Sequence, residues 1–286
     1  MPRFGKRVTD ALKSMLRPAL VADHSFVVAD WSAIEGRVNP WLCGAEAKLD
    51  IFRQRLDPYK VNAAATYGVR YEDVTDEQRQ VGKVQELALG FGGSTGAFAA
   101  MGRGYGVRFE EAQARRIVDA WRRANPWAVM FWQDLERAYM SAMRHPGHEF
   151  TAGRITYVYD KQHLWYMLPS GRVLCYPFAK FEGEHLTYAK ASWKPAADAT
   201  EWPRARLWGG LACENVTQAS AHDILRAALR QCDGVVAHVH DEIVIETAEP
   251  EKAKAELERI MVTPPDWAVG LPLDVKVEVM TRYGKG

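Results

Sequence analysis

The hydrophobic pattern of the chain is strongest in two short runs near its ends, and both runs lead into acidic residues. Residues 26–29 (F-V-V-A) come directly before Asp30, and the run at 235–245 contains H-D-E, with Asp241 at its centre. Both runs are rich in β-branched residues, which favour strands, so each is predicted to be a buried strand that carries a carboxylate at its end. The second run is predicted to be a hairpin with residues 240 and 241 at its tip.

Between these runs the pattern changes from helical to strand-like. Amphipathic segments predict helices at 32–40, 46–54, 58–67, 76–90, 109–124 and 127–143, with prolines as punctuation. From about residue 150 the sequence alternates and is rich in aromatic residues, which predicts strands with a turn at 168–172 and a loop near 194–203. A helix at 211–231, the hairpin, a helix at 250–261 and a strand at 273–280 complete the order. This order predicts an α+β fold in which both ends of the chain build one sheet and the helical middle is inserted between them.

Composition narrows the class of protein only a little. The 286 residues are 48% hydrophobic, which is typical of one large globular domain or two ordinary ones. No apolar run is long enough to cross a bilayer and no secretory leader precedes the first strand, so we expect a cytoplasmic protein without a membrane partner. The four cysteines are far apart and form no C-x-x-C pair, which favours buried thiols over a disulfide scaffold or a zinc module.

Basic residues gather in two clusters, although the net charge is only +1. Metal-binding carboxylates can balance a local basic surface, so the net charge neither supports nor excludes a nucleic-acid partner. Each cluster could line a phosphate backbone or be an ordinary solvated face. The first cluster comprises Arg3, Lys6, Arg7, Lys13 and Arg17, and the second comprises Arg103, Arg108, Arg115, Arg116, Arg122 and Arg123.

The two aspartates are candidate metal ligands. Asp30 is at a junction between a strand and a helix, where its carboxylate and the carbonyl of Trp31 could face a metal ion. Aspartates brought together from distant points can hold two divalent ions about 3.5–4 Å apart, an arrangement that catalyses in-line phosphoryl displacement. The alternative is that Asp30 or Ser32 caps the following helix.

The helix predicted at 76–90 carries a candidate nucleotide site. Arg79, Lys83, Leu87 and Phe91 fall on one stripe at helical spacing, so two cations lead into an apolar surface. The cations could bind the β- and γ-phosphates, Lys83 could protonate a departing pyrophosphate, and the apolar part could face sugar and base. An i,i+4 pair of cations is also typical of a solvated face. The glycines at 90–96 match neither the G-x-G-x-x-G fingerprint nor a P-loop. This excludes a Rossmann dinucleotide-binding site and a Walker-type phosphate site.

The hairpin offers a different metal chemistry. His238 and His240 are predicted to share a strand face, and His-x-His can be half of a metal site, so a metal-dependent phosphoesterase is an alternative. Such a site needs further ligands at recognisable spacing, and the remaining histidines form no such set. A lone, buried His238 is the simpler interpretation.

Four motifs, taken together, resemble the family A (DNA polymerase I-like) DNA polymerases, particularly their bacteriophage branch. D-W-S-A-I-E-G-R at 30–37 looks like the family's D-Y-S-x-I-E-x-R, and residues 79–92 look like its R-x-x-x-K-x-x-x-F/Y-x-x-x-Y-G. V-H-D-E at 239–242 is its third motif, and Q-A-S-A-H-D-I-L at 218–225 is similar to its Q-G-T-A-A-D-I-I. The resemblance extends from about residue 17 to the end.

The resemblance implies a polymerase palm and a mostly helical fingers insertion. Residues 1–38 and 207–286 would form the palm, and residues 39–206 would form the fingers and connecting strands. Asp30 and Asp241 would hold two Mg²⁺ ions, for which Mn²⁺ could substitute, with the Trp31 carbonyl as a further ligand and Glu242 in support.

The resemblance also implies which residues bind the two substrates, the dNTP and the DNA. Arg79 and Lys83 would bind the triphosphate of a dNTP as their helix closes over it. Leu87, Phe91 and Glu35 would face the base and sugar, and Glu35 would crowd a 2′ hydroxyl. The residues implied in binding primer-template DNA are His240, Gln218 and Asn215. The implied function is template-directed DNA synthesis, and the alternative is a DNA-binding subunit that does not synthesise DNA.

The sequence departs from the family pattern at several points. Leu87 replaces the usual aromatic residue, Phe91 replaces a tyrosine, and Glu214 replaces an asparagine, although Asn215 is adjacent. Because Asp30 is only thirty residues from Met1, the family's thumb and 3′–5′ exonuclease have no counterpart in this sequence. We therefore expect either a split polymerase, in which a second polypeptide supplies the thumb and exonuclease, or a truncated polymerase. The split arrangement is favoured, and in both cases we expect no proofreading within this chain.

Overall fold

The computed structural model describes residues 15–190 and 202–284, and it divides into two compact units. The first unit contains Ala221–Val269 and the described parts of Met1–Ile34 and Leu273–Gly286. The second contains Gly270–Pro272 and the described part of Glu35–Ser220. Arg3, Lys6, Arg7, Lys13 and most of the predicted loop at 194–203 lie outside the described residues.

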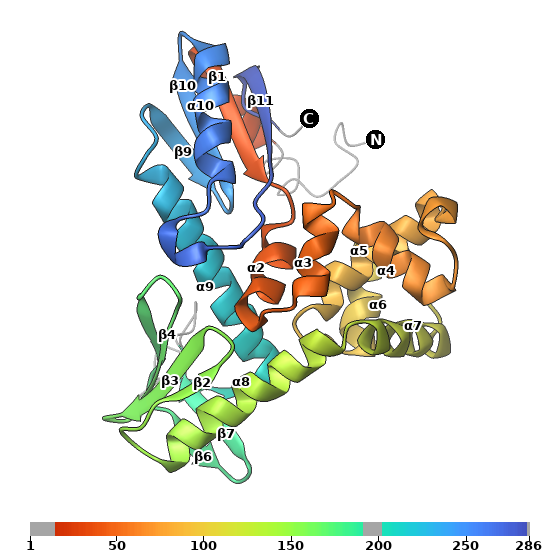
Figure 1. Ribbon diagram of the computed structural model, residues 1–286, viewed down its shortest axis with the longest axis vertical. Helices are drawn as coiled ribbons and strands as arrows, with labels where there is room; N and C mark the ends of the chain where they lie inside the picture. The colour runs from red at the N-terminus through yellow and green to blue at the C-terminus, as the bar shows by residue number, and fades with distance from the viewer. Residues whose placement is uncertain (1–14, 191–201, 285–286) are drawn as a thin grey trace, which may run out of the picture. The chain divides into compact units, whose positions relative to one another are not determined.

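The first unit is built on a four-stranded antiparallel sheet (Figure 1). Its strand order is β11 (Val275–Arg282), β1 (Val21–Trp31), β10 (Glu242–Thr247) and β9 (Val235–Val239). The strand nearest the beginning of the chain is therefore paired on both sides by strands from its end. This confirms the prediction that both ends of the sequence build one sheet, and it confirms the hairpin at β9 and β10.

The two faces of this sheet have different environments, because successive side chains of a strand point to opposite sides. On one face, the indole nitrogen of Trp31 donates a hydrogen bond to the Met261 carbonyl in α10 (Pro250–Val262), at 2.7 Å, so α10 packs on that face. The opposite face carries Asp30 at the end of β1. The hydrophobic cluster beside Asp30 on that face is formed by Phe26, Val28, Val244 and Tyr283.

Most of the second unit is helical. Its helices are α2 (Ile34–Cys43, which begins at the unit boundary), α3 (Glu46–Arg53), α4 (Pro58–Tyr67), α5 (Asp76–Leu89), α6 (Thr95–Gly104), α7 (Glu111–Ala124) and α8 (Pro126–Arg144). Asp57 caps α4, and Thr75 with Gln78 forms a capping box at the start of α5. The helical core contains Val81, Val84, Leu89, Phe98, Ile117, Val118 and Trp121.

Two details of this region differ from the predicted pattern. Pro40 lies inside α2 and does not end it. Helix α6 was not predicted, because its glycines have low helix propensity. One of them is needed for packing, since a Cβ at Gly102 would lie 2.7 Å from the ring of Phe109. Phe109 stacks on Phe98 of α6 with ring centroids 4.6 Å apart, so tertiary packing and a Ser94 cap stabilise a helix that propensity does not favour.

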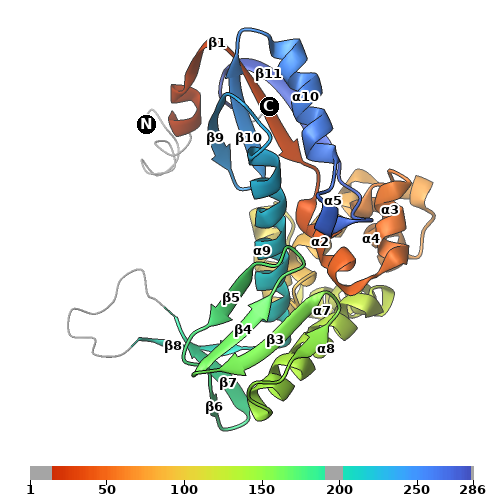
Figure 2. The same ribbon diagram turned by 60° about the vertical axis from the view of Figure 1, so that its left-hand side comes forward.

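The aromatic region forms two small antiparallel sheets, and Figure 2 shows them together with α8. One contains β2 (Phe150–Ala152), β3 (Ile155–Asp160), β4 (His163–Met167) and β5 (Val173–Tyr176); the other contains β6 (Lys180–Glu182), β7 (His185–Ala189) and β8 (Arg204–Leu207). The turn predicted at 168–172 is confirmed, and Leu168 N donates to the Arg172 carbonyl at 2.9 Å within it. The buried rings that pack in series are Tyr139, Tyr157, Tyr166, Tyr176 and Tyr188.

Helix α9 (Gly209–Leu229) begins in the second unit and ends in the first. At its start the backbone approaches the turn after α5 so closely that only glycine fits. A Cβ at Gly210 would lie 2.1 Å from the Trp208 ring and 2.3 Å from the carbonyl oxygen of Phe91. This contact fixes Phe91, one of the predicted nucleotide-binding residues, against the beginning of α9.

The cysteines are free thiols, but the prediction that all four are buried is wrong for three of them. Only Cys213 is buried, whereas Cys43, Cys175 and Cys232 are half-buried. Burial raises the pKa of Cys43 and of Cys232 to about 11, so these thiols stay protonated to a more alkaline pH than an exposed cysteine does. Across residues 15–190 and 202–284, the helices are either too short or too polar to span a membrane.

Candidate active site

Three acidic residues of the first unit, Asp30, Asp241 and Glu242, lie at one end of its sheet. Asp30 in β1 is directly opposite Glu242 in β10, and Asp241 precedes Glu242 in the two-residue turn between β9 and β10. Residues opposite each other in an antiparallel pair project from the same face of the sheet. The strand pairing thus places Asp30 beside the turn that carries Asp241, as the sequence predicts. Lys276 of β11 is opposite Asp30 on its other side.

Both segments that carry the aspartates contain a non-glycine residue in the left-handed backbone region. Ala33, between β1 and α2, has φ 54°, and His240 in the hairpin turn has φ 56°. Such conformations cost of order 1–3 kcal/mol and often occur at functional sites. His240 therefore lies in the turn and not in β9, which ends at Val239.

Two expectations about the histidines are wrong. His238 is exposed rather than buried, because β9 is an edge strand of the sheet. It does not share a strand face with His240, which lies in the turn. Among the described residues, no three His, Cys, Asp or Glu side chains are grouped closely enough to hold a metal ion, so the ligand cluster that the phosphoesterase alternative needs is not formed.

Glu242 is buried and bound to a residue that sequence reasoning missed. The hydroxyl of Tyr283 donates a hydrogen bond to Glu242 Oε1. Burial first, then this hydrogen bond and the Glu242 charge, raise the pKa of Tyr283 to about 12, while Arg17 lowers it and Asp30 raises it. The Arg17 guanidinium lies 5.3 Å from the centre of the ring. Tyr283 therefore remains a protonated donor at neutral pH and fixes the Glu242 side chain next to Asp30.

The donor set at this sheet end suits magnesium better than zinc. Carboxylate and carbonyl oxygens are the ligands that Mg²⁺ prefers, and it is usually held by one or two carboxylates together with water and substrate phosphates. Asp30, Asp241 and the backbone of Trp31 provide such oxygens. A preformed cage of three or more protein ligands is not required for an ion held in this way.

The two cations of α5 have defined partners in the second unit. Arg79 Nε donates to Asp57 Oδ2 at 2.5 Å, and the Arg79 guanidinium lies 5.2 Å from the centre of the Tyr59 ring. The Lys83 ammonium lies 5.0 Å from the centre of the Tyr105 ring. The Arg79 side chain is 38% exposed, so an incoming anion can reach it and compete with Asp57. Sequence reasoning found neither Asp57 nor the two tyrosines.

The carboxyl end of α5 is held by hydrogen bonds to a single carbonyl. Asn39 Nδ2 and Trp132 Nε1 both donate to the Gly90 oxygen, at 3.1 Å and 3.0 Å. Cys213 in turn donates to Asn39 Oδ1 at 3.2 Å. These contacts fix the half-buried Leu87 and Phe91 at the end of the helix.

The residues predicted to contact sugar and DNA fall into two groups. Gln218 Nε2 donates to Glu35 Oε1, so α9 and α2 bring these two predicted site residues together. Asn215 Nδ2 instead donates to the Tyr176 hydroxyl at 2.9 Å, which directs it toward the tyrosines of the small sheet. Glu214 is exposed.

The second basic cluster is mostly exposed, with one exception. Arg122 donates to the Gly93 carbonyl at 3.1 Å and so supports the turn after α5. The five exposed arginines are Arg103, Arg108, Arg115, Arg116 and Arg123, of which Arg115 is paired with Glu111 at 3.5 Å.

Comparisons with known proteins agree with the fold. The chain is 35% identical over 288 residues to the DNA polymerase of Bacillus phage SP02, a match covering 98% of this chain and 44% of the phage protein. It is 27% identical over 246 residues to DNA polymerase I of Pseudomonas aeruginosa, covering 82% of this chain and 22% of that protein. No protein-family model matches the chain.

A solved structure shows the same fold. The POL domain of Pol1 from M. smegmatis, in complex with DNA primer-template and dNTP, superposes with a TM-score of 0.62 and 17% identity, covering 93% of this chain and 42% of that one. The fold of the chain is therefore that of a DNA polymerase domain. The chain is similar in sequence to a phage DNA polymerase and to a bacterial DNA polymerase I, and it spans less than half the length of these relatives.

Proposed function

We propose that this chain is the catalytic part of a template-directed DNA polymerase, which transfers a nucleotide from a dNTP to the 3′ hydroxyl of a primer. The observation that carries the proposal is the pairing of β1 with β10, which puts Asp30 beside the turn containing Asp241. The similarity to a phage DNA polymerase, which covers 98% of this chain and 44% of the phage protein, supports it. The left-handed backbone conformations of Ala33 and His240, close to the two aspartates in sequence, also support it.

Asp30 and Asp241 are the proposed ligands of two Mg²⁺ ions, with Mn²⁺ as an expected substitute and the Trp31 carbonyl as a further ligand. When bound, such ions lower the pKa of an attacking hydroxyl and neutralise charge on a triphosphate. Glu242 supports the site through its hydrogen bond to Tyr283, which keeps its carboxylate in one position.

The proposed role of α5 is to bind the triphosphate. Arg79 exchanges its ion pair with Asp57 for phosphate oxygens, and Lys83 binds the leaving pyrophosphate and donates a proton to it. Leu87 and Phe91 face the base and sugar, and Glu35, held by Gln218, crowds a 2′ hydroxyl. His240, Gln218 and Asn215 are the proposed DNA contacts.

The proposed substrates are primer-template DNA and dNTPs, which places the reaction in the cytoplasm of a bacterial cell or a phage-infected host. We further propose that a second polypeptide supplies the thumb and exonuclease. Support comes from an apolar surface at the first described residues, where Met15, Leu16, Leu20 and Val21 are 50–71% exposed. Mass spectrometry of the protein purified from its natural host would reveal this polypeptide, and recovery of one longer chain would contradict it.

Primer extension with Mg²⁺ and four dNTPs tests the catalytic proposal. Asp241→Asn should lower the extension rate by at least about 100-fold, because a bound metal contributes several kcal/mol to such reactions. The matched control is Asp233→Asn, an exposed aspartate of the same unit, which should extend at the parent rate. Equal extension by Asp241→Asn and the parent would rule out the metal role.

A second measurement does not depend on the assembled polymerase. Mn²⁺ binding followed by electron paramagnetic resonance should be weakened by Asp241→Asn and unchanged by Asp233→Asn. Strong Mn²⁺ binding by the parent without any extension, even with its natural partners present, would favour the DNA-binding subunit that does not synthesise DNA.

A further inference from the structure

Helix α5 contains a largely buried carboxylate, Glu86, close to its two candidate phosphate-binding residues, Arg79 and Lys83. Glu86 is seven residues after Arg79 and three after Lys83, so it projects from the same side of the helix. Its side chain is only 11% exposed. A triphosphate carries several negative charges, and a carboxylate on this side of α5 would oppose its binding unless the charge is offset.

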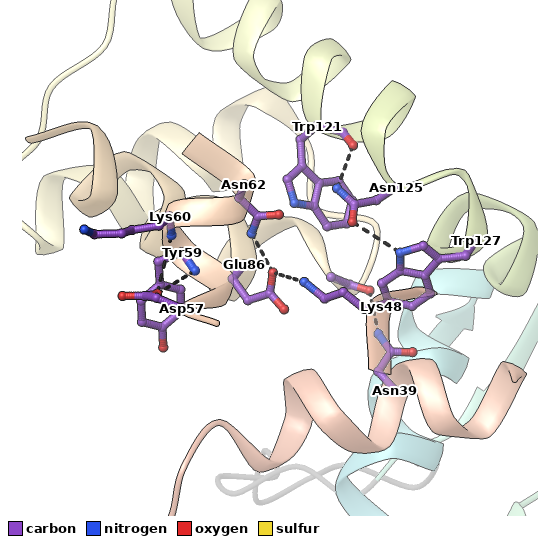
Figure 3. Close-up of polar contacts among 11 residues, drawn as sticks. Asn39, Lys48, Asp57, Tyr59, Lys60, Asn62, Glu86, Trp121, Asn125 and Trp127 are labelled. Atoms are coloured by element: carbon purple, nitrogen blue, oxygen red, sulfur yellow. Dashed lines mark hydrogen bonds and ion pairs between the residues drawn. The ribbon is translucent and has the colours of Figure 1, made fainter. Parts of the chain in front are cut away.

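Two buried side chains offset and hold this carboxylate (Figure 3). Lys48 Nζ of α3 donates to Glu86 Oε2 at 2.9 Å, and Asn62 Nδ2 of α4 donates to the same oxygen at 2.6 Å. The Lys48 side chain is 4% exposed, and Asn62 is 4% exposed as a residue. Glu86 therefore joins three helices through one oxygen atom.

Further contacts follow the same seam between α4 and α5. Gln85 Nε2 donates to Thr66 Oγ1 at 2.8 Å, and a Cβ at Gly82 would lie 2.0 Å from the Tyr59 carbonyl oxygen. These contacts set how closely α4 and α5 approach. Of these contacts, only those of Glu86 involve a charged side chain and reach a third helix, α3.

The interaction energy of Glu86 with Lys48 and Asn62 argues for a role other than stability alone. A buried ion pair loses much of its Coulomb energy to desolvation, and apolar residues of similar volume often hold helices equally well. Removing only one partner, by contrast, leaves an uncompensated charge in a medium of low dielectric constant. Here the uncompensated charge would be a carboxylate three residues from Lys83.

We propose that Lys48 and Asn62 are positioning residues for α5, which neutralise and immobilise Glu86 so that Arg79 and Lys83 present a positive surface to the triphosphate. The proposal rests on the nucleotide-binding role of α5 proposed above. Lys48 does not contact the nucleotide; it acts through the charge and position of Glu86.

The test is a double-mutant cycle of Lys48 and Glu86. Two quantities are measured for each variant: the KM for a dNTP, and the dissociation constant of dATP–Mg²⁺ by calorimetry. Lys48→Met should raise KM and the dissociation constant roughly three- to tenfold, the effect of one unit charge at short range, with little change in kcat. Adding Glu86→Gln to that variant should return both values to within about twofold of the parent. Lys48→Arg should behave as the parent.

A surface pair of the same residue types is the matched control. Lys252 and Glu249 of the α10 region are 3.4 Å apart with both side chains more than 70% exposed, so Lys252→Met should leave KM unchanged. If Lys48→Met does not fold, Glu86→Gln alone remains informative, because it should bind dATP at least as tightly as the parent.

Two results would overturn the proposal. One is a folded Lys48→Met variant with the KM of the parent; the other is a double variant as impaired as Lys48→Met. Lys83→Ala separates this failure from failure of the proposed function. If Lys83→Ala does not weaken dATP binding, then α5 is not the nucleotide site. If it does while Lys48→Met has no effect, only the positioning role is lost.

Discussion

Asp57 illustrates how one side chain in this protein serves two structural purposes. Its Oδ1 accepts hydrogen bonds from the backbone of Tyr59 and Lys60 as the cap of α4, and its Oδ2 binds Arg79 (Figure 3 shows the cap). On the proposed function, the cap would remain in place when Arg79 exchanges Asp57 for a phosphate. In the proposed function, Asp57 would therefore hold the Arg79 side chain before a nucleotide binds and would not be needed for binding afterwards.

Tyr283 and Glu242 form the corresponding pair beside the aspartates. Tyr283→Phe leaves the buried Glu242 carboxylate without this donor, which should lower the free energy of unfolding by about 1–3 kcal/mol. Denaturant unfolding would measure it. Tyr67→Phe, at a residue 39% exposed, is the control and should change the free energy by less than about 0.5 kcal/mol. Equal stability of the two variants would show that the Tyr283 hydrogen bond contributes nothing.

At the scale of elements, α5 depends on its close approach to α4. Gly82→Ala places a methyl group 2.0 Å from the Tyr59 carbonyl oxygen, so the helices must separate. We expect a loss of about 1–3 kcal/mol in the free energy of unfolding, although alanine favours a helix more than glycine does. Thermal unfolding of the purified variant would measure this loss.

The control for that variant is Gly104→Ala in α6. A Cβ at Gly104 has no neighbour within 4 Å, so this substitution should be neutral or stabilise by up to about 1 kcal/mol. If both variants behave alike, then the contact between α4 and α5 adapts to a methyl group and does not set the position of α5.

Short-range signals explain which elements were predictable. The capping box at Thr75 and the cap at Asp57 act within four residues, and both mark a helix start that the structure confirms. Helix α6 was missed because its stability comes from Phe109, which packs on it from outside the helix. The burial of His238 was predicted wrongly because the sequence does not say that β9 is an edge strand.

At the scale of the whole molecule, buried phenols link stability to pH. Burial raises the pKa of Tyr157 and Tyr176 well above the ordinary value of about 10. The folded protein therefore retains these protons at alkaline pH, whereas the unfolded chain releases them. The contribution of these two phenols to the free energy of unfolding is complete below pH 10 and declines as the pH rises further. The melting temperature should therefore fall steeply above about pH 10.

Tyr157→Phe tests this linkage. It removes one of the titrating phenols, so its melting temperature should fall less steeply than that of the parent between about pH 9 and pH 11. At pH 7 the variant should be about as stable as the parent, because the Tyr157 hydroxyl has no hydrogen-bond partner among the described residues. Parallel pH profiles for the two proteins would contradict the assignment.

The sequence by itself determined the α+β class, most of the helices, the hairpin, and the candidates Asp30, Asp241, Arg79 and Lys83. These features depend on periodicity, caps and short motifs, which are local. Their catalytic and binding roles stay predictions, as does the division into palm and fingers.

Only the tertiary structure decided what surrounds those candidates. It paired Arg79 with Asp57, Lys83 with the Tyr105 ring, and Glu242 with Tyr283. It also joined Lys48 and Asn62 to Glu86 across three helices. Lysine, asparagine and tyrosine are common surface residues, and nothing local distinguishes one that will be buried against a partner. Their contacts arise from the packing of segments distant in sequence, and so only the folded chain specifies them.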